Sequence, residues 1–121
     1  MSIVLADHNP ETLEEAVDIL VSNINDEERV YLSQINIEEL HHSLGRHIRN
    51  EWKLWEPESK LHKFFVEEYG LGHADDMSGI ILYAFHARVM NKEYDPRQTA
   101  HEYQKFWSDQ KIDPVTQESF S

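Results

Sequence analysis

The chain has 121 residues, which is the usual size of one domain and too short for two ordinary ones. It contains no cysteine, so disulfides, thiolate metal ligands and a cysteine nucleophile are excluded. Its net charge of −12 opposes binding to duplex nucleic acid and to anionic membranes. No signal peptide and no apolar stretch long enough to cross a bilayer is found, so we expect a cytoplasmic protein.

The charge is spread unevenly along the chain. Residues 1–40 contain ten acidic residues and one basic residue, Arg29, a balance of −9. Residues 41–63 contain five basic and three acidic residues, a balance of +2, together with four histidines. Residues 64–121 have a balance of −5. The middle segment is therefore a basic island in an acidic protein, although the general acidity is also explained by solubility alone.

The N-terminal third begins with helix signals. Asn9 is the expected N-cap of a first helix and Pro10 its first residue, an arrangement that suits both residue types. Apolar residues at helical spacing follow, namely Leu13, Ala16, Val17, Leu20 and Ile24.

Two further capping signals follow the first helix. Asn25 and Glu28 resemble a capping box, which predicts a second helix that ends near Gln34. Asn36 and Glu39 repeat the same spacing.

A third helix is predicted over residues 37–55. One apolar face would consist of Ile37, Leu40, Leu44, Ile48, Trp52 and Trp55. Trp55 is expected to lie in the core. The opposite face would carry His42, Arg46, Arg49 and Lys53. Glu56-Pro57 should end this helix.

The C-terminal half predicts three more helices. The fourth covers residues 59–69 and is closed by Gly70, which suits a left-handed C-cap. The fifth, residues 75–91, is apolar nearly all round and is expected to be the buried central helix. The last begins at Asp95-Pro96, and the tail from about Lys111 is expected to be loose. Strand signals are nearly absent, so we predict a single compact all-α domain of five to six helices.

Two sequence blocks resemble an uncharacterised family of small bacterial and phage proteins, classed as a domain of unknown function. The family pattern is roughly LGxxIRNxWxLW, a spacer, and HPDDMSxxIL. The first block is matched by Leu44, Gly45, Ile48, Arg49, Asn50, Trp52, Leu54 and Trp55. The second is matched by Asp75, Asp76, Met77, Ser78, Ile81 and Leu82. Ala74 replaces a common Pro, and Lys53 replaces a common Gly. The resemblance implies no activity; it implies a phage or mobile-element origin.

The basic island suggests a site for a small anionic ligand. Two arginine side chains one helical turn apart can hold a phosphate or carboxylate, and tryptophan can stack a base. The candidate ligand-binding residues are His42, Arg46, Arg49, Asn50, Trp52, Lys53, Asp75 and Asp76. The alternative interpretation is structural, with the Arg residues on a solvated helix face or paired with acidic side chains.

The start of the fifth helix offers a second candidate cluster. Asp75 and Asp76 are explained by helix capping alone, or by ion pairing with Arg46 or Arg49. The eight histidines lack the spacing of a metal site, so we expect neither a metal nor a cofactor. Ser78 beside two acidic residues is not by itself evidence for a nucleophile.

The sequence thus gives two functional hypotheses. The favoured one is a non-catalytic acidic protein, of the inhibitor or antidote type, that binds a basic surface of a partner protein, for example a nuclease. Its partner-binding residues would be Glu11, Glu14, Glu15, Asp18, Asp26, Glu27 and Glu28. The alternative is a protein, or an enzyme, that binds a small anionic, nucleotide-like ligand. Its binding residues would be Arg46, Arg49, Asn50, Asp75 and Asp76. No catalytic residue is assigned.

Overall fold

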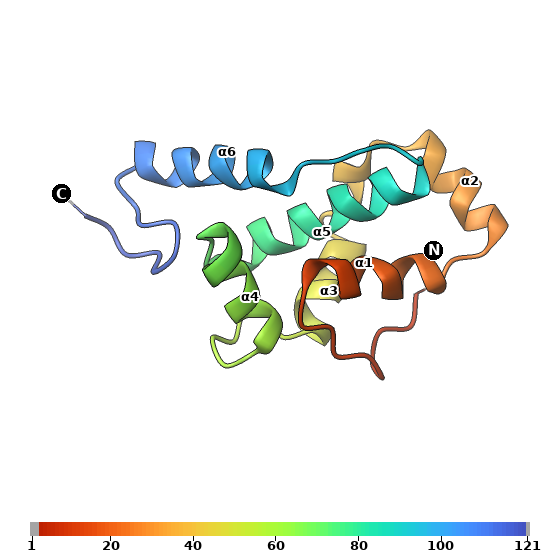
Figure 1. Ribbon diagram of the computed structural model, residues 1–121, viewed down its shortest axis with the longest axis horizontal. Helices are drawn as coiled ribbons and strands as arrows, with labels where there is room; N and C mark the ends of the chain where they lie inside the picture. Colours follow the sequence, from red (N-terminus) through yellow and green to blue (C-terminus); the bar gives the residue numbers. More distant parts are fainter. Residues whose placement is uncertain (1–2, 121) are drawn as a thin grey trace.

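The computed structural model describes residues 3–120 and has six α-helices and one 3₁₀ helix (Figure 1). In chain order these are α1 (Leu13–Ser22), α2 (Asp26–Gln34), η1 (Ile37–Leu40), α3 (Leu44–Glu51), α4 (Lys60–Tyr69), α5 (Ala74–Val89) and α6 (Pro96–Asp109). Within these residues the only β-type pairing is an isolated bridge between Ile112 and Ser119. The predicted all-α domain is confirmed.

Helix α5 is the central element, as predicted. Every other helix packs against it, and Figure 1 shows it running through the middle of the molecule. Its buried side chains point in several directions, because Met77, Ile80, Ile81 and Phe85 are each fully inaccessible to solvent. A helix that is apolar nearly all round is stable only when neighbours cover it on all sides. The other helices therefore form a shell around α5.

The first helix begins later than predicted. Thr12, rather than Asn9, is the N-cap, and its hydroxyl accepts a hydrogen bond from the Glu15 backbone N–H at 3.2 Å. Thr12 and Glu15 have the spacing of a capping box, and the helix begins at this signal rather than at Asn9-Pro10. The prediction for α2 is confirmed: Asn25 and Glu28 form both hydrogen bonds of a capping box.

The predicted continuous helix over residues 37–55 is wrong. The segment consists of η1, a turn at residues 41–43, α3, and a second turn. Ile37, Leu40, Leu44, Ile48 and Trp52 are nevertheless all buried. Apolar spacing of three or four residues reports which side chains face the core, and it is compatible with 3₁₀ turns as well as with one α-helix.

The end of this segment explains why Trp55 is not in the core. Lys53 has a φ of +54°, in the left-handed region that favours glycine, and it takes the chain out of the helix. Leu54 is consequently fully buried, whereas Trp55 is 53% exposed. The predicted core position of Trp55 is wrong because helical spacing does not continue past Lys53.

The C-terminal elements follow the predicted order. Gly70 closes α4 in the left-handed conformation, and Asp95 caps α6. The segment after Lys111, for which the sequence predicts a loose tail, folds back onto the start of α5. The Gly72 N–H donates to the Pro114 carbonyl at 2.9 Å, and the Phe120 N–H donates to the Lys111 carbonyl at 2.8 Å.

We predict that Ile80→Ala lowers the free energy of unfolding by about 2–5 kcal/mol, because it leaves a cavity at the centre of the shell. Urea denaturation followed by circular dichroism measures this. Val30→Ala is a matched control, since Val30 is a helical aliphatic residue that is 57% exposed. It should change stability by less than about 0.5 kcal/mol. Similar small changes in both variants would contradict the central position of α5.

Candidate functional site

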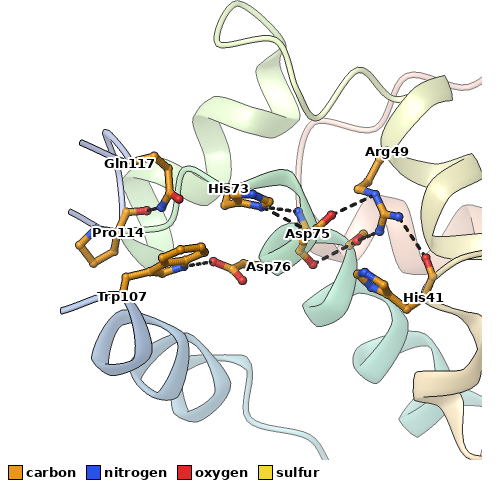
Figure 2. Close-up of polar contacts among 9 residues, drawn as sticks. His41, Arg49, His73, Asp75, Asp76, Trp107, Pro114 and Gln117 are labelled. Atoms are coloured by element: carbon orange, nitrogen blue, oxygen red, sulfur yellow. Dashed lines mark hydrogen bonds and ion pairs between the residues drawn. The ribbon is translucent and has the colours of Figure 1, made fainter. Parts of the chain in front are cut away.

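The start of α5 concentrates the buried polar groups of the molecule. Of the four buried polar or charged residues among residues 3–120, Arg49, Asp76 and Ser78 lie here. Figure 2 shows Arg49 and Trp107 approaching the helix start from opposite sides. We refer to Arg49, His73, Asp75, Asp76 and Trp107 as the α5 cluster.

Arg49 is held on three sides. Its Nη1 donates to the Ser78 hydroxyl at 2.7 Å, and its Nη2 donates to the His41 carbonyl at 3.1 Å. Its Nε lies 3.4 Å from Asp75 Oδ1 (Figure 2). The residue is only 5% exposed. Arg49 thus joins the end of η1, helix α3 and helix α5, and the expected ion pairing of an island arginine with Asp75 is present.

The predicted position of Arg49 on the helix face opposite the core is therefore wrong, whereas the alternative, pairing with Asp75, is present. Its guanidinium turns inward because Gly45, one turn earlier, has no side chain: a Cβ there would lie 3.1 Å from Arg49 Nη1. The turn at residues 41–43 also rotates α3 relative to η1, so a single helical wheel drawn over residues 37–55 misplaces Arg49. His42, Arg46 and Lys53 are exposed as predicted.

His73 and the two aspartates at the helix start have different partners. The His73 Nδ1 accepts a hydrogen bond from the Asp75 backbone N–H at 3.0 Å, which makes His73 the N-cap. Its ring lies between Trp55 and Trp107, with centroid distances of 5.5 and 5.4 Å. Asp75 faces Arg49 and its side chain is 44% exposed. Asp76 faces α6 and is 8% exposed.

Asp76 is a buried carboxylate without a cation. Its Oδ2 accepts a hydrogen bond from the Trp107 Nε1–H at 2.7 Å, and no ion pair to it occurs within residues 3–120 (Figure 2). Burial raises the pKa of Asp76, while the Trp107 hydrogen bond and nearby His73 oppose this. A buried charge is ordinarily paired, so Asp76 is energetically unusual.

Five of the eight residues predicted to bind an anionic ligand line one or the other of two pockets. His42, Asp75 and Asp76 line a pocket of about 420 Å³ between η1, α5 and α6. Trp52 and Lys53 line another of about 280 Å³ near Pro10. Arg46 and Asn50 are exposed and line neither of these pockets. The N–H groups of Arg49 point at protein atoms, so little of the guanidinium is free for a ligand.

Sequence reasoning missed several residues around the α5 cluster. These are Glu38, Gly79, Tyr83, Tyr103 and Trp107. A signal for part of this set exists, because Asp75 or Asp76, Gly79 and Tyr83 recur every three or four residues and so share one face of α5. Tyr103 and Trp107 are likewise four residues apart on α6, but nothing in the sequence pairs the two helices.

The geometry does not resemble a hydrolytic site. The Ser78 hydroxyl accepts from Arg49 and donates to the Asp75 carbonyl at 3.1 Å, so it is not activated by a base. Within residues 3–120 no group of three His, Cys, Asp or Glu side chains is arranged to hold a metal ion. In the same part of the chain no helix has both the length and the apolar character to span a membrane.

We predict that Arg49→Ala lowers the free energy of unfolding by about 3 kcal/mol, because it leaves the Ser78 hydroxyl and the His41 carbonyl without their hydrogen-bond donor. Asp75→Ala should cost less than about 1 kcal/mol, since its carboxylate is partly solvated. The double variant should lose less than the two single losses together. Chemical denaturation measures all three, with Arg46→Ala as the exposed control on the same helix. Small and additive losses would show that the contacts of Arg49 do not stabilise the fold.

The buried carboxyl group of Asp76 makes the stability of the fold depend on pH. A carboxyl group whose pKa is higher in the folded than in the unfolded chain stabilises the fold when protonated, and this stabilisation is lost as pH rises through the folded pKa. Asp76→Asn keeps an acceptor for Trp107 and removes the charge. We expect this variant to melt at or above the wild-type temperature at neutral pH, and its advantage to shrink towards about pH 4. A destabilisation of equal size at every pH would contradict the penalty on the buried charge.

A match to a known protein family spans most of these elements. Residues 9–89 match the model of a family described as "Domain of unknown function (DUF6794)". No curated protein and no solved structure matches the chain. The matched range contains Arg49, Asp75 and Asp76 and ends with α5, so that Tyr103 and Trp107 lie beyond it. Because the match spans more than half of the 121 residues, the chain belongs to this family of unknown function, DUF6794.

Proposed function

We propose that the protein is a non-catalytic binding protein, of the inhibitor or antidote type, whose acidic helices α1 and α2 bind a basic surface of a partner protein. The observation that carries this proposal is the outer face of α2. Asp26, Glu27, Val30 and Tyr31 are spaced three to four residues apart and so share this face, which we call the α2 face. Val30 is 57% and Tyr31 47% exposed.

The combination of charges and apolar groups favours a protein partner over solubility alone. Only Leu32 of α2 is buried, so most of this short helix faces solvent. A surface that served solubility alone would not need an exposed aliphatic and an exposed aromatic residue between its carboxylates. Tyrosine is enriched at the energetically important positions of protein interfaces, and surrounding acidic groups accelerate encounter with a basic partner.

Most acidic side chains of α1 and α2 have no competing cation. In the part of the chain that the structure describes, Glu11 pairs with Lys60 at 3.4 Å and Asp18 pairs with Arg88 at 2.8 Å. Both pairs are exposed and therefore weak. Glu15 and Glu28 take part in helix capping, and Glu14, Asp26 and Glu27 have no side-chain partner there. These three carboxylates are available to a partner.

The alternative hypothesis, a small anionic ligand on the basic island, has less support. Arg49 is enclosed by Ser78, His41 and Asp75. The remaining cations Arg46 and Lys53 are exposed. Lys53 and Lys60 both line the pocket of about 280 Å³, but the carboxylates of Glu11 and Glu51 line it too, and Glu11 pairs with Lys60. Binding of a basic protein to the acidic surface explains more of the charge distribution along the chain than binding of an anionic ligand does.

The test is capture of partners from the source organism, followed by kinetics. Wild-type protein on a solid support should retain a basic protein, identified by mass spectrometry. Glu14→Gln, Asp26→Asn and Glu27→Gln together should slow association by about tenfold at 50 mM salt. Raising salt to about 500 mM should slow the wild type in the same way. A triple variant at Glu67, Glu93 and Glu118, all to Gln, loses the same charge elsewhere and is the control.

The apolar part of the α2 face is tested separately. Tyr31→Ala should mainly accelerate dissociation, because an anchor residue acts after encounter. Phe106→Ala removes a comparably exposed aromatic ring from α6, where Phe106 is 55% exposed, and should leave dissociation unchanged. Surface plasmon resonance gives both rates. An association rate that does not depend on salt, or equal effects of the two triple variants, would rule out recognition through α1 and α2.

A further inference from the structure

The pocket between η1, α5 and α6 combines acidic groups with aromatic walls. It has a volume of about 420 Å³, enough for a small organic group and far more than a single ion requires. Glu38, Asp75 and Asp76 contribute carboxylates, and Tyr83 and Tyr103 contribute rings. The histidines His41 and His42 complete part of the wall.

The charges of this pocket are not balanced from within. Arg49 neutralises Asp75, but Glu38 and Asp76 form no ion pair in the chain as described from residue 3 to residue 120. Asp76 is the decisive residue, since it is only 8% exposed and its single hydrogen bond comes from the neutral Trp107 indole through Oδ2. Figure 2 shows this carboxylate between α5 and α6, turned away from Arg49. Removing a carboxylate from water without a counter-charge is costly.

The other lining groups leave room for a positive charge. The Tyr83 hydroxyl donates to Glu38, whereas the Tyr103 hydroxyl has no hydrogen-bond partner among the described residues. Burial, and then the nearby Arg49 charge, lowers the pKa of His41, which disfavours a positive charge on this imidazole. Gly79 lies directly beneath Tyr103, and a Cβ at Gly79 would come within 2.6 Å of the Tyr103 hydroxyl. The absence of that side chain allows the Tyr103 hydroxyl to pack closely against the backbone of α5.

We propose that this pocket binds an organic cation, an alkylammonium or guanidinium group, which is held by Asp76 and Glu38 and covered by the Tyr83 and Tyr103 rings. Charge-assisted hydrogen bonds to carboxylates and contact with tyrosine faces are the interactions that such cations make. The proposal goes beyond binding through the α2 face, because the pocket lies at α5 and α6. The cation is either a free small amine or a basic side chain of a partner protein.

The experiment uses two probes, agmatine for a free cation and the blocked peptide acetyl-Gly-Arg-Gly-amide for a basic side chain. Isothermal titration calorimetry at about 50 mM salt limits screening. We expect the wild-type chain to bind at least one probe with a dissociation constant of about 1 mM or tighter. Binding of agmatine alone identifies a small amine as the ligand class, and binding of the peptide identifies a protein side chain.

Three variants locate the bound cation. Asp76→Asn should weaken binding by at least about tenfold, since it removes the buried charge. Gly79→Ala leaves the net charge unchanged and should weaken binding by a similar factor by displacing Tyr103. Tyr103→Phe should weaken it less, by about threefold, through the loss of one acceptor. Glu93→Gln, at an exposed position outside both the pocket and the α2 face, also removes one negative charge and should bind as the wild type does. Circular dichroism confirms that each variant is folded.

The outcomes are distinguishable from those of the partner experiment. If Asp76→Asn fails to fold, Gly79→Ala and Tyr103→Phe decide the question. Equal weakening by Glu93→Gln and Asp76→Asn would show attraction to the general acidity of the chain, and would overturn the proposal. So would wild-type affinity in Gly79→Ala and Asp76→Asn, or no binding of either probe. None of these results affects capture of a partner by α1 and α2, and failure of that capture leaves agmatine binding intact.

Discussion

The enclosure of the Arg49 guanidinium is the interaction on which the arrangement of the middle of the chain depends. Its N–H groups reach a backbone carbonyl at the end of η1, a hydroxyl within α5 and a carboxylate at the start of α5. A planar group with several fixed donors can join three elements in this way, whereas lysine, with one flexible ammonium, cannot. Its burial also requires a small residue at Gly45. The break between η1 and α3, which interrupts an otherwise regular apolar pattern, accompanies this inward turn.

Two adjacent carboxylates at the start of α5 illustrate how much the surroundings decide. Consecutive helical residues point about 100° apart, so Asp75 faces α3 and Asp76 faces α6. Asp75 lies beside the Arg49 guanidinium and is partly solvated, so little free energy is needed to keep its carboxylate charged. Asp76 meets an indole N–H and is nearly excluded from water. Aspartate therefore forms a stabilising ion pair at position 75. At position 76 its charged form is unfavourable unless a proton or a cation neutralises it.

Acidic side chains gather in two separate places in the structure. On α1 and α2 the carboxylates lie near the exposed Val30 and Tyr31, and this is the surface for which we propose binding to a basic protein. Between η1, α5 and α6 a pocket is lined by the buried Asp76, the half-buried Asp75 and the exposed Glu38. The range shared with the DUF6794 family includes the α2 face and the start of α5, while Tyr103 and Trp107 come from α6, beyond this range. The pocket between η1, α5 and α6 is thus completed by a part of the chain outside the family match.

Local signals in the sequence were sufficient for the all-α class, the order of the helices, the capping of α2 and α6, the end of α4 at Gly70 and the central position of α5. Capping residues and apolar spacing act over a few residues, and these features depend on nothing more. The break of the 37–55 segment, the burial of Arg49, the exposure of Trp55 and the pairing of Asp76 with Trp107 were decided by the tertiary structure. Each of these features depends on groups brought together from distant parts of the chain, or on the left-handed turn at Lys53. The periodicity of one segment carries no information about which helix packs against it.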